Sequence, residues 1–349
     1  MDTYRAPRCY LRIGGVKVAC ESATVKLKST RSGNTFSAVL AVGETRKAGF
    51  DYAEWADYQP ADVTVVMSSA LNFGDEKDMI TGKIDKPEID WFTGKVSVSG
   101  RDKTGELTEK KRSQKFQNQK TDEVVKTIAG DHGLSVSGAD GGLDFAGKIF
   151  KDDTVHLTVN RTDFEIISDL AEREGYRWYV QGTTLYFEPK EQDASGVYQV
   201  QFTPPGAGGS IGTGNILALR TWRNMTAAKP HEVNVRSWHH EEKKLYSGKA
   251  TAGGVGSDTA VMEHHHNGRN DEQSEKLAKS RLANAIRHDC NVSIHTAGDL
   301  DIDPRQKLQL TGTGTIYDQV YDIDTVELHI DWGAGFTMDI ESKAAKQGR

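Results

Sequence analysis

Histidines are the first residues in this sequence whose type and spacing can support chemistry. Three in a row, His264, His265 and His266, precede a segment with helical periodicity, and His288 closes that segment. Imidazole is a common zinc ligand, but zinc sites draw their ligands from fixed, separated positions. Neighbouring residues in an extended chain point to opposite faces, so only His264 and His266 can converge. We therefore expect a solvated loop or an assembly contact here rather than a metal site.

Other clusters of ionisable residues also lack the spacing of a catalytic or binding site. The segments DGGLD (140–144) and DLDID (299–303) cluster carboxylates, but both lack the dozen-residue ligand spacing of a calcium-binding loop, so we predict turns. WHHEE (238–242) is interpreted as a strand end rather than a ligand set. No nucleophile elbow, HExxH, P-loop or GxGxxG motif occurs. The sequence therefore predicts no catalytic, cofactor-binding or metal-binding residue and no enzymatic activity.

The composition excludes several classes of partner. The 349 residues carry a formal net charge of -6, which gives no general attraction to nucleic acid or anionic membranes. We expect neither sequence-specific nucleic-acid binding nor membrane insertion, because no apolar run approaches the roughly 20 residues of a spanning helix. The N-terminal segment has no apolar signal-peptide core, so we expect a soluble protein made in a cytoplasm without a secretion signal. Cys9, Cys20 and Cys290 form no CxxC pair and are predicted to be buried thiols, although an intermolecular disulfide is left open.

The elements that must position these residues are mainly β-strands. Apolar and polar residues alternate in ATVKLKS (23–29), DVTVVM (62–67) and KVSVSG (95–100). Alternation with a period of two places one face of each strand inward, and several such strands favour a closed or sandwiched antiparallel barrel over residues 1–101. Strands resume after the glycine-rich segment 203–214 and continue to the end of the chain. We find no short sequence repeat, but the two strand-rich blocks have the pattern of structural duplicates.

A smaller α/β region separates the two blocks. Residues 103–120 are basic and are interpreted as a solvated linker, with a phosphate-binding strip as the alternative. One helix is predicted after an N-cap at Thr121, and a second after Thr162, whose spacing to Glu165 matches a capping box. YRWYVQG and TTLYFEP then predict a β-hairpin. Farther along, Asn270 is expected to cap the helix that follows the histidines.

Several of these segments together resemble one protein family. VSVSGRDKTGEL ends the first strand-rich block, and KTDEVVKTIAGDHGL and DFEIISDLAEREGYRWYVQGTTLYFEP follow it. The chain closes with DQVYDIDTVELHID and GFTMDIES. This series resembles the phage tail baseplate hub proteins, also called late control gene D proteins, which are related to the hub part of type VI secretion spike proteins.

The resemblance implies a mainly β fold with α+β insertions, in which two antiparallel β-barrel domains carry smaller peripheral α/β domains. It places the first barrel at 1–101, an α/β domain at 102–195, the second barrel at 196–243 and 290–345, and a peripheral insertion at 244–289. It also implies a homotrimer with pseudo-sixfold symmetry that joins a hexameric tail tube to a trimeric central spike. Tape measure and baseplate wedge proteins are further expected partners. The implied location is the virion tail tip, after assembly in the host bacterial cytoplasm.

Two rival functions remain open from the sequence. One is a tail-associated peptidoglycan hydrolase with β-rich binding modules. The other is a carbohydrate- or receptor-binding module, which would need neither tube nor spike. Neither rival is supported by a segment left over for a catalytic domain, nor by a constellation of acids or histidines.

Overall fold

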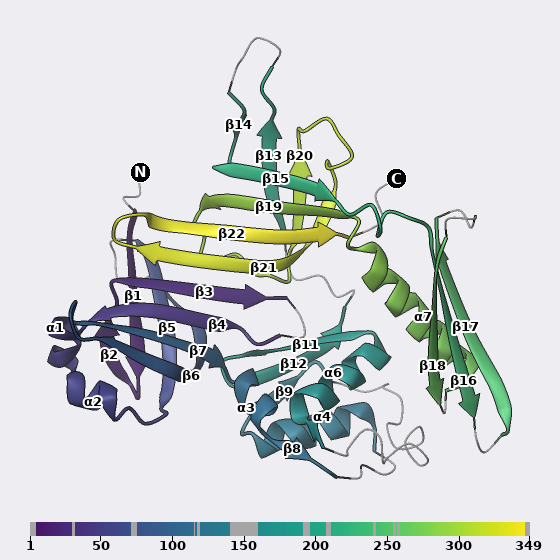
Figure 1. The fold of residues 1–349 in the computed structure, drawn as a ribbon, viewed down its shortest axis with the longest axis horizontal. Helices are drawn as coiled ribbons and strands as arrows, with labels where there is room; N and C mark the ends of the chain where they lie inside the picture. Colours follow the sequence, from purple (N-terminus) through teal and green to yellow (C-terminus); the bar gives the residue numbers. More distant parts are fainter. Residues whose placement is uncertain are drawn as a thin grey trace.

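Alternating side chains build most of this chain into β-strands, arranged as one large sheet with two smaller units beside it (Figure 1). The structure, a computed structural model, describes residues 5–29, 32–70, 75–114, 116, 119–139, 160–190, 196–206, 211–239, 242–253, 256, 259–267 and 269–345. The fold is mainly β with helical insertions, as predicted. The DGGLD segment, for which a turn is predicted, lies outside the described residues.

The first block of the chain contributes seven strands to the large sheet. Inward-facing residues such as Val25, Val63 and Val96 are completely buried, as the alternation predicts. The strands are β1 (Arg5–Ile13), β2 (Val16–Ala19), β3 (Ser22–Lys28), β4 (Thr35–Ala41), β5 (Asp62–Ala70), β6 (Glu76–Asp90) and β7 (Lys95–Asp102). Three short helices lie between β4 and β5, namely α1 (Val42–Thr45), η1 (Arg46–Ala48) and α2 (Tyr52–Ala56). Trp55 of α2 is buried in the same apolar core.

The second block contributes another seven strands. They are β13 (Val197–Thr203), β14 (Thr213–Gly214), β15 (Ala218–Arg223), β19 (Cys290–Ala297), β20 (Lys307–Thr311), β21 (Val320–Asp331) and β22 (Gly335–Ala344). Antiparallel pairing of β21 with β3 joins the two blocks into one fourteen-stranded sheet. One continuous apolar core runs through both blocks. Separate closed barrels are therefore not evident from the sheet itself.

The two blocks share one strand order. The first runs β2-β1-β5-β6-β7-β4-β3 across the sheet, and the second runs β14-β13-β20-β21-β22-β19-β15. When the seven strands of each block are numbered along the chain, both orders become 2-1-5-6-7-4-3. The pairs agree in direction except one, because β1 and β5 are antiparallel whereas β13 and β20 are parallel. This agreement supports the expectation of structural duplication.

A short sequence repeat marks the duplication, contrary to our prediction that there is none. IDWFTG (89–94) joins β6 to β7, and IDWGAG (330–335) joins β21 to β22. Both have the pattern Ile-Asp-Trp-x-x-Gly at the same place in the strand order. The motif is six residues long and 235 residues separate its two copies, so strand periodicity alone does not draw attention to it.

The repeated motif forms the same turn twice. In the first turn, the Asp90 carboxylate accepts hydrogen bonds from two backbone amides of the same turn, Phe92 N at 2.9 Å and Thr93 N at 3.2 Å. Asp331 likewise accepts from Gly333 N at 2.7 Å and Ala334 N at 3.1 Å. The closing glycines, Gly94 and Gly335, have φ values of 65° and 78°, which residues with a side chain rarely adopt. Aspartate and glycine are thus required by the turn itself.

The α/β region forms a unit with its own apolar core. Its elements are α3 (Thr104–Glu109), β8 (Lys111–Arg112), α4 (Thr121–Asp131), β9 (Ser135–Ser137), β10 (Arg161–Thr162), α6 (Asp163–Glu174), β11 (Tyr176–Gln181) and β12 (Thr184–Pro189). The predicted capping box of Thr162 and Glu165 and the predicted hairpin are confirmed. The helix predicted at Thr121 is present, but its N-cap is Lys120.

The prediction of a solvated linker at 103–120 is wrong. Leu107 of α3 is completely buried and Phe116 is 5% exposed, so both belong to the core of the α/β unit. Arg112, one of the basic residues, is also buried. The high lysine content conceals these buried positions, because exposed residues such as Lys110 and Lys111 lie close to them in the sequence.

The peripheral unit is a three-stranded sheet covered by one helix. Its elements are β16 (His231–His239), β17 (Lys244–Ala252), β18 (Ala260–Asn267) and α7 (Asp271–Ile286). Asn270 caps α7 as predicted, and Leu277 and Ala278 pack on Val233 and Val235. Two corrections follow. The three histidines lie in strand β18 rather than in a loop, and β16 pairs with β17 and β18 rather than with the large sheet.

Candidate assembly surfaces

Both repeated turns lie at one end of the large sheet. Successive antiparallel pairs connect β21, β3, β4, β7 and β6, so β21 and β6 run in the same direction and end on the same side. We call this side the tip end, on the left in Figure 1. Trp91 is 65% exposed and Trp332 is 88% exposed there. The sequence analysis missed these two residues, and the repeated Ile-Asp-Trp motif was the signal that identifies them.

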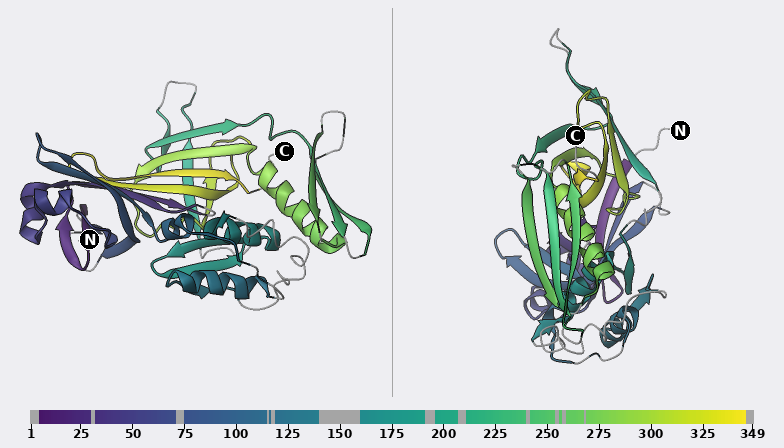
Figure 2. Two further views of the ribbon diagram at one scale, coloured as in Figure 1. Left: turned by 60° about the horizontal axis from the view of Figure 1, so that its bottom comes forward. Right: turned by 90° about the vertical axis from the view of Figure 1, so that its right-hand side faces the viewer.

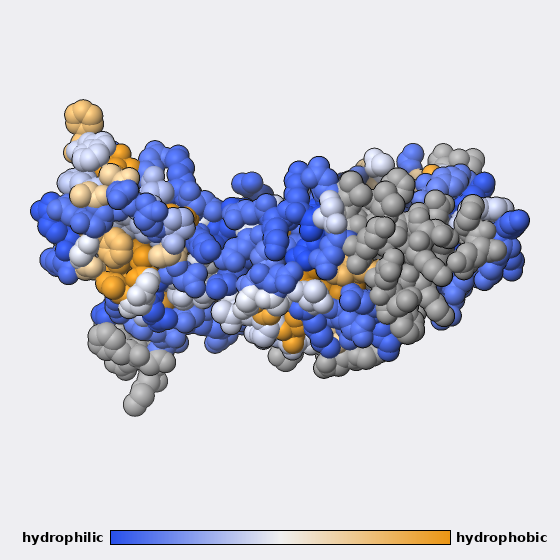
Figure 3. Space-filling view, turned by 90° about the horizontal axis from the view of Figure 1, so that it is seen from below, coloured by the Kyte–Doolittle hydropathy of each residue, from blue (hydrophilic) through white to orange (hydrophobic). Residues whose placement is uncertain are grey.

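Apolar side chains gather at the tip end. Trp91 stacks on Tyr52 of α2 with ring centroids 5.0 Å apart, and the neighbouring Phe92 is fully exposed. Figure 3 shows apolar residues gathered at this end, whereas the middle of the same face is mostly hydrophilic. Exposed aromatic clusters of this kind on a folded protein mark contact sites for another molecule.

The opposite side of the sheet, here called the domain end, differs strongly between the two blocks. In the first block a short segment, 29–34, joins the third strand to the fourth, whereas in the second block 224–289 lies between the corresponding strands. The α/β unit leaves from this same end after β7, but β22 is followed by no such unit in the described chain. The left view of Figure 2 shows the peripheral unit beyond the right-hand end of the large sheet and the α/β unit beside the right half of the sheet.

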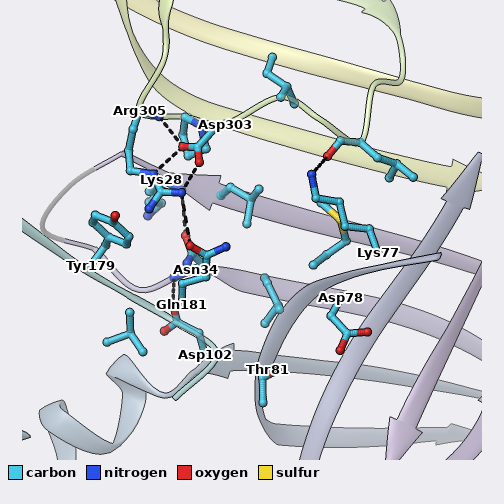
Figure 4. A pocket seen from close by; sticks show the side chains of 18 of the residues that line it. Lys28, Asn34, Lys77, Asp78, Thr81, Asp102, Tyr179, Gln181, Asp303 and Arg305 are labelled. Atoms are coloured by element: carbon cyan, nitrogen blue, oxygen red, sulfur yellow. Dashed lines mark hydrogen bonds and ion pairs between the residues drawn. The ribbon is translucent and has the colours of Figure 1, made fainter. Parts of the chain in front are cut away.

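A pocket lies where the α/β unit meets both blocks (Figure 4). Its volume is about 110 Å³. Arg305 stacks over the Tyr179 ring at 4.0 Å and forms an ion pair with Asp303, and burial raises the pKa of Tyr179 to about 12. Lys77 donates to the Leu300 carbonyl at 2.7 Å. The DLDID segment contains a turn, as predicted. Arg305 fixes the α/β unit against the second block, whereas Lys77 connects the two blocks.

An ion-pair network inside the α/β unit holds its two main helices. The Asp163 carboxylate at the start of α6 is completely buried and contacts Arg112 Nη2 at 2.8 Å and His132 Nε2 at 2.7 Å. Arg112 also donates to Asp131 at 2.9 Å. Hydrogen bonding to Asp163 raises the pKa of Arg112. The network has the chemistry of a structural clamp between β8, α4 and α6.

The histidines face a positively charged surrounding. His264 and His266 share one side of β18 with ring centroids 6.5 Å apart, while His265 is exposed. Burial first, then Arg269 and Arg281, lowers the pKa of His266 to about 4. Burial also lowers the pKa of His264 and of His288, so His288 is not held protonated as a helix-end charge. Neutral imidazoles near the charges of Arg269 and Arg281 fit a packing role between β18 and α7.

The three cysteines are buried and free, as predicted. Hydrogen bonding to the Cys9 side chain, then burial, raises the pKa of Cys20. Within the described ranges, no three His, Cys, Asp or Glu side chains gather closely enough to bind a metal ion. No helix in the described part of the chain has the length and apolarity needed to cross a membrane.

Comparison with solved structures finds similar folds in several phage tail proteins. Solved structures with similar folds include a tail protein from Neisseria meningitidis MC58 and the 43 kDa tail protein of prophage MuSo2 from Shewanella oneidensis, each with a TM-score of 0.70. The first is 14% identical, with 97% of this chain and 96% of that chain covered; the second is 15% identical, with 97% and 99% covered. A type VI secretion component from E. coli is 11% identical over 95% of this chain and 76% of its own, with a TM-score of 0.57.

These structural similarities concern the fold. The comparison with curated proteins finds no match. The family model for the phage tail baseplate hub (GPD) matches residues 54–332, which include the first copy of the repeated turn, the start of the second, the whole α/β unit and the peripheral unit. That match covers well over half of the sequence, and so the chain belongs to the phage tail baseplate hub family.

Proposed function

We propose that this chain is the structural hub of a phage or phage-like tail tip, a homotrimer that adapts a hexameric tail tube to a trimeric central spike. The observation that carries this proposal is the duplicated strand order within one chain. Two similar units per chain become six in a trimer, so a threefold assembly presents a nearly sixfold ring. We assign the chain no catalytic residue, cofactor or metal in this role.

We further propose that each seven-strand unit is a β-barrel. In the first unit, residues 16–28 pass from β1 to β4. Cys20 N donates to Cys9 O at 3.3 Å, and Glu21 N to Val39 O at 2.8 Å. In the second unit, Asn215 N donates to Gln201 O at 3.2 Å and Leu217 N to His295 O at 2.9 Å. In each unit, one segment thus connects the two outer strands of the order, as closure of a barrel requires.

Domain boundaries follow from these pairings. The first barrel spans 1–101 and the α/β domain 102–195, as the sequence suggests. The second barrel comprises about 196–230 and 290–345, and the peripheral insertion begins near His231 because β16 belongs to the peripheral sheet. The insertion therefore lies between the third and fourth strands of the second barrel.

The two ends of the sheet match partners of different symmetry. Two similar tryptophan-bearing tips per chain give six in a trimer, so we propose that the tip end faces the hexameric tube. At the domain end, the α/β domain and the insertion occur once per chain, so that surface repeats only three times. We therefore propose that the trimeric spike binds at the domain end. Tape measure and wedge proteins, and assembly in the host cytoplasm before incorporation in the virion tail, belong to the same proposal.

The mass of the purified protein tests this function. Native mass spectrometry should give about 115 kDa, three times the chain mass of 38.4 kDa. The trimer should also bind a candidate tube protein and a candidate spike protein. A stable monomer that binds neither contradicts the proposal. Lysis of peptidoglycan by the purified chain, measured with and without zinc, would instead support a hydrolase.

A further inference from the structure

The joint between the two blocks is an antiparallel strand pair with a defined register. β21 pairs with β3 from Thr325 opposite Lys28 to Asp331 opposite Ser22. Ile330 lies opposite Ala23, and both are buried, at 3% and 1% exposure. This joint connects the sixth strand of the second unit with the third strand of the first.

The two remaining strands of the same kind are free at their edges. The sixth strand of the first unit is β6, and β5 pairs with it only as far as Lys83, so residues 84–90 have one edge that no described strand pairs with. The third strand of the second unit is β15, which pairs only with β19 among the described strands. A ring of similar units requires that each unit make the same joint with its neighbour on both sides. The open edges of β6 and β15 are the two halves of such a joint.

The repeated turn fixes how these edges align. Asp90 corresponds to Asp331, so Ile89 corresponds to Ile330. The other side of the joint is reached by following the pairs across the first unit. Val98, three residues after the start of β7, lies opposite Ala38 of β4. Ala38 in turn lies opposite Ala23 of β3.

The same count in the second unit leads to Leu217. Three residues from the start of β22 is Met338, which lies opposite Thr296. Leu217 directly precedes Ala218, the first residue of β15, and the Leu217 amide donates to the carbonyl of His295, the residue opposite Ala218. Leu217 is 67% exposed, whereas its counterpart Ala23 is buried. An apolar edge residue this exposed favours association with another strand.

We propose that, in the trimer, β6 of one chain pairs antiparallel with β15 of the next chain in the register of β21 with β3. Glu88 then lies opposite Ala218 and Lys86 opposite Arg220, and Ile89 lies next to Leu217, which directly precedes β15. The partner is a second copy of this chain, because the template for the contact is present within the chain itself. This inference rests on the proposed trimeric hub and adds the residues that close it.

Side chains at the open edges make this joint weaker than its template but leave one favourable charge contact. Arg220 is exposed and makes no ion pair within the described part of the chain, and the register places it diagonally across from Glu88, within reach of a long side chain. Lys86 lies directly opposite Arg220, where like charges repel, but the ion pair of Lys86 with Glu88 at 2.5 Å offsets part of that repulsion. Pro87 stands in the place of Leu328 and has no N–H, so the joint has one potential hydrogen bond fewer than its template.

Cysteine cross-linking tests the register. Opposite residues in antiparallel strands have Cα atoms about 4.5–5.5 Å apart, a separation that a disulfide spans. The variant Glu88→Cys/Ala218→Cys should therefore form a covalent three-chain species of about 115 kDa after mild oxidation, three times 38.4 kDa. Glu88→Cys alone, Ala218→Cys alone and the shifted pair Glu88→Cys/Arg220→Cys should form little or none. Thr24→Cys/His329→Cys is the positive control and should cross-link within one chain, because Thr24 Oγ1 and His329 Nδ1 are 2.8 Å apart.

Native mass measured on the same samples separates the two proposals. A trimer that gives no Glu88→Cys/Ala218→Cys cross-link overturns the inferred register and leaves the trimeric hub intact. A monomer overturns both. Covalent chains longer than three subunits support the strand pairing but contradict a closed trimer.

Discussion

Replacement of Leu217 by serine should weaken the trimer without unfolding the subunit. Full burial of a leucine side chain stabilises by about 1.5–3 kcal/mol. Leu217 is 67% exposed in the single chain, so its burial in the joint accounts for about two thirds of that range, or about 1–2 kcal/mol. A closed trimer has three joints, which gives about 3–6 kcal/mol and changes the trimerisation constant about 10²- to 10⁴-fold.

Sedimentation equilibrium over a range of protein concentrations measures this change. The concentration of half-assembly varies as the inverse square root of the trimerisation constant, so it should rise about 10- to 100-fold. Leu245→Ser is the matched control, because Leu245 is 58% exposed on β17 and lies outside the proposed joint. Thermal unfolding of the dilute subunit should be alike for both variants. If Leu217→Ser and the control assemble at the same concentration as the unchanged protein, the proposed joint is wrong.

Three other predictions concern the remaining parts of the molecule. Asp163→Ala leaves the buried Arg112 without its main counter-charge, so hydrogen exchange of α4 and α6 should show a loss of about 3–5 kcal/mol in protection, whereas a loss below 1 kcal/mol would contradict the clamp. The pKa of His266 is lowered to about 4, so the unfolded chain takes up its proton first as the pH falls; the stability that the neutral imidazole contributes is present above about pH 6.5 and lost toward pH 4. Hydrogen exchange of residues 231–289 should therefore increase over that interval, and His266→Leu should reduce the increase; an equal pH response in the variant would argue against this origin. Trp91→Ala/Trp332→Ala should weaken binding to a tube protein in a pull-down while the native mass stays trimeric, and unchanged tube binding would remove the tip end as the tube contact.

Local chemistry decided which parts of the fold were predictable from the sequence. The alternation of apolar and polar residues predicted the strands around Val25 and Val63, because side chains along a strand point to opposite faces with a period of two residues. The capping boxes at Thr162 and Asn270 were predictable because all of their hydrogen bonds lie within four residues. The histidines were misplaced because β18 is fixed by its pairing with β16, about 30 residues away in the sequence.

The assembly surfaces were harder to predict because their residues are ordinary one at a time. The sequence neighbours of each exposed tryptophan become informative only when the two distant copies of the Ile-Asp-Trp motif are compared, and Leu217 follows a glycine-rich segment that indicates a loop. Only the shared strand order shows that Leu217 stands in the place of Ala23 and that two edges lack partners. The duplication therefore allows a contact between chains to be predicted from the equivalent contact within one chain.

The two kinds of joint differ in a way that assembly itself requires. The two strands of the joint within the chain are covalently connected, so they are never exposed to solvent as separate folded surfaces. Ile330 and Ala23 can therefore be buried, and Lys26 forms a 3.0 Å ion pair with Glu327 in the same strand pair. The halves of the proposed joint between chains must remain in solution until they meet. A proline and charged residues on an open strand edge reduce indiscriminate pairing with other chains, and Pro87 and Lys86 stand on β6 at such positions. The same register thus forms a permanent contact within the chain, where apolar residues are buried. Between chains, proline and charged residues on the open edge limit its pairing with other partners.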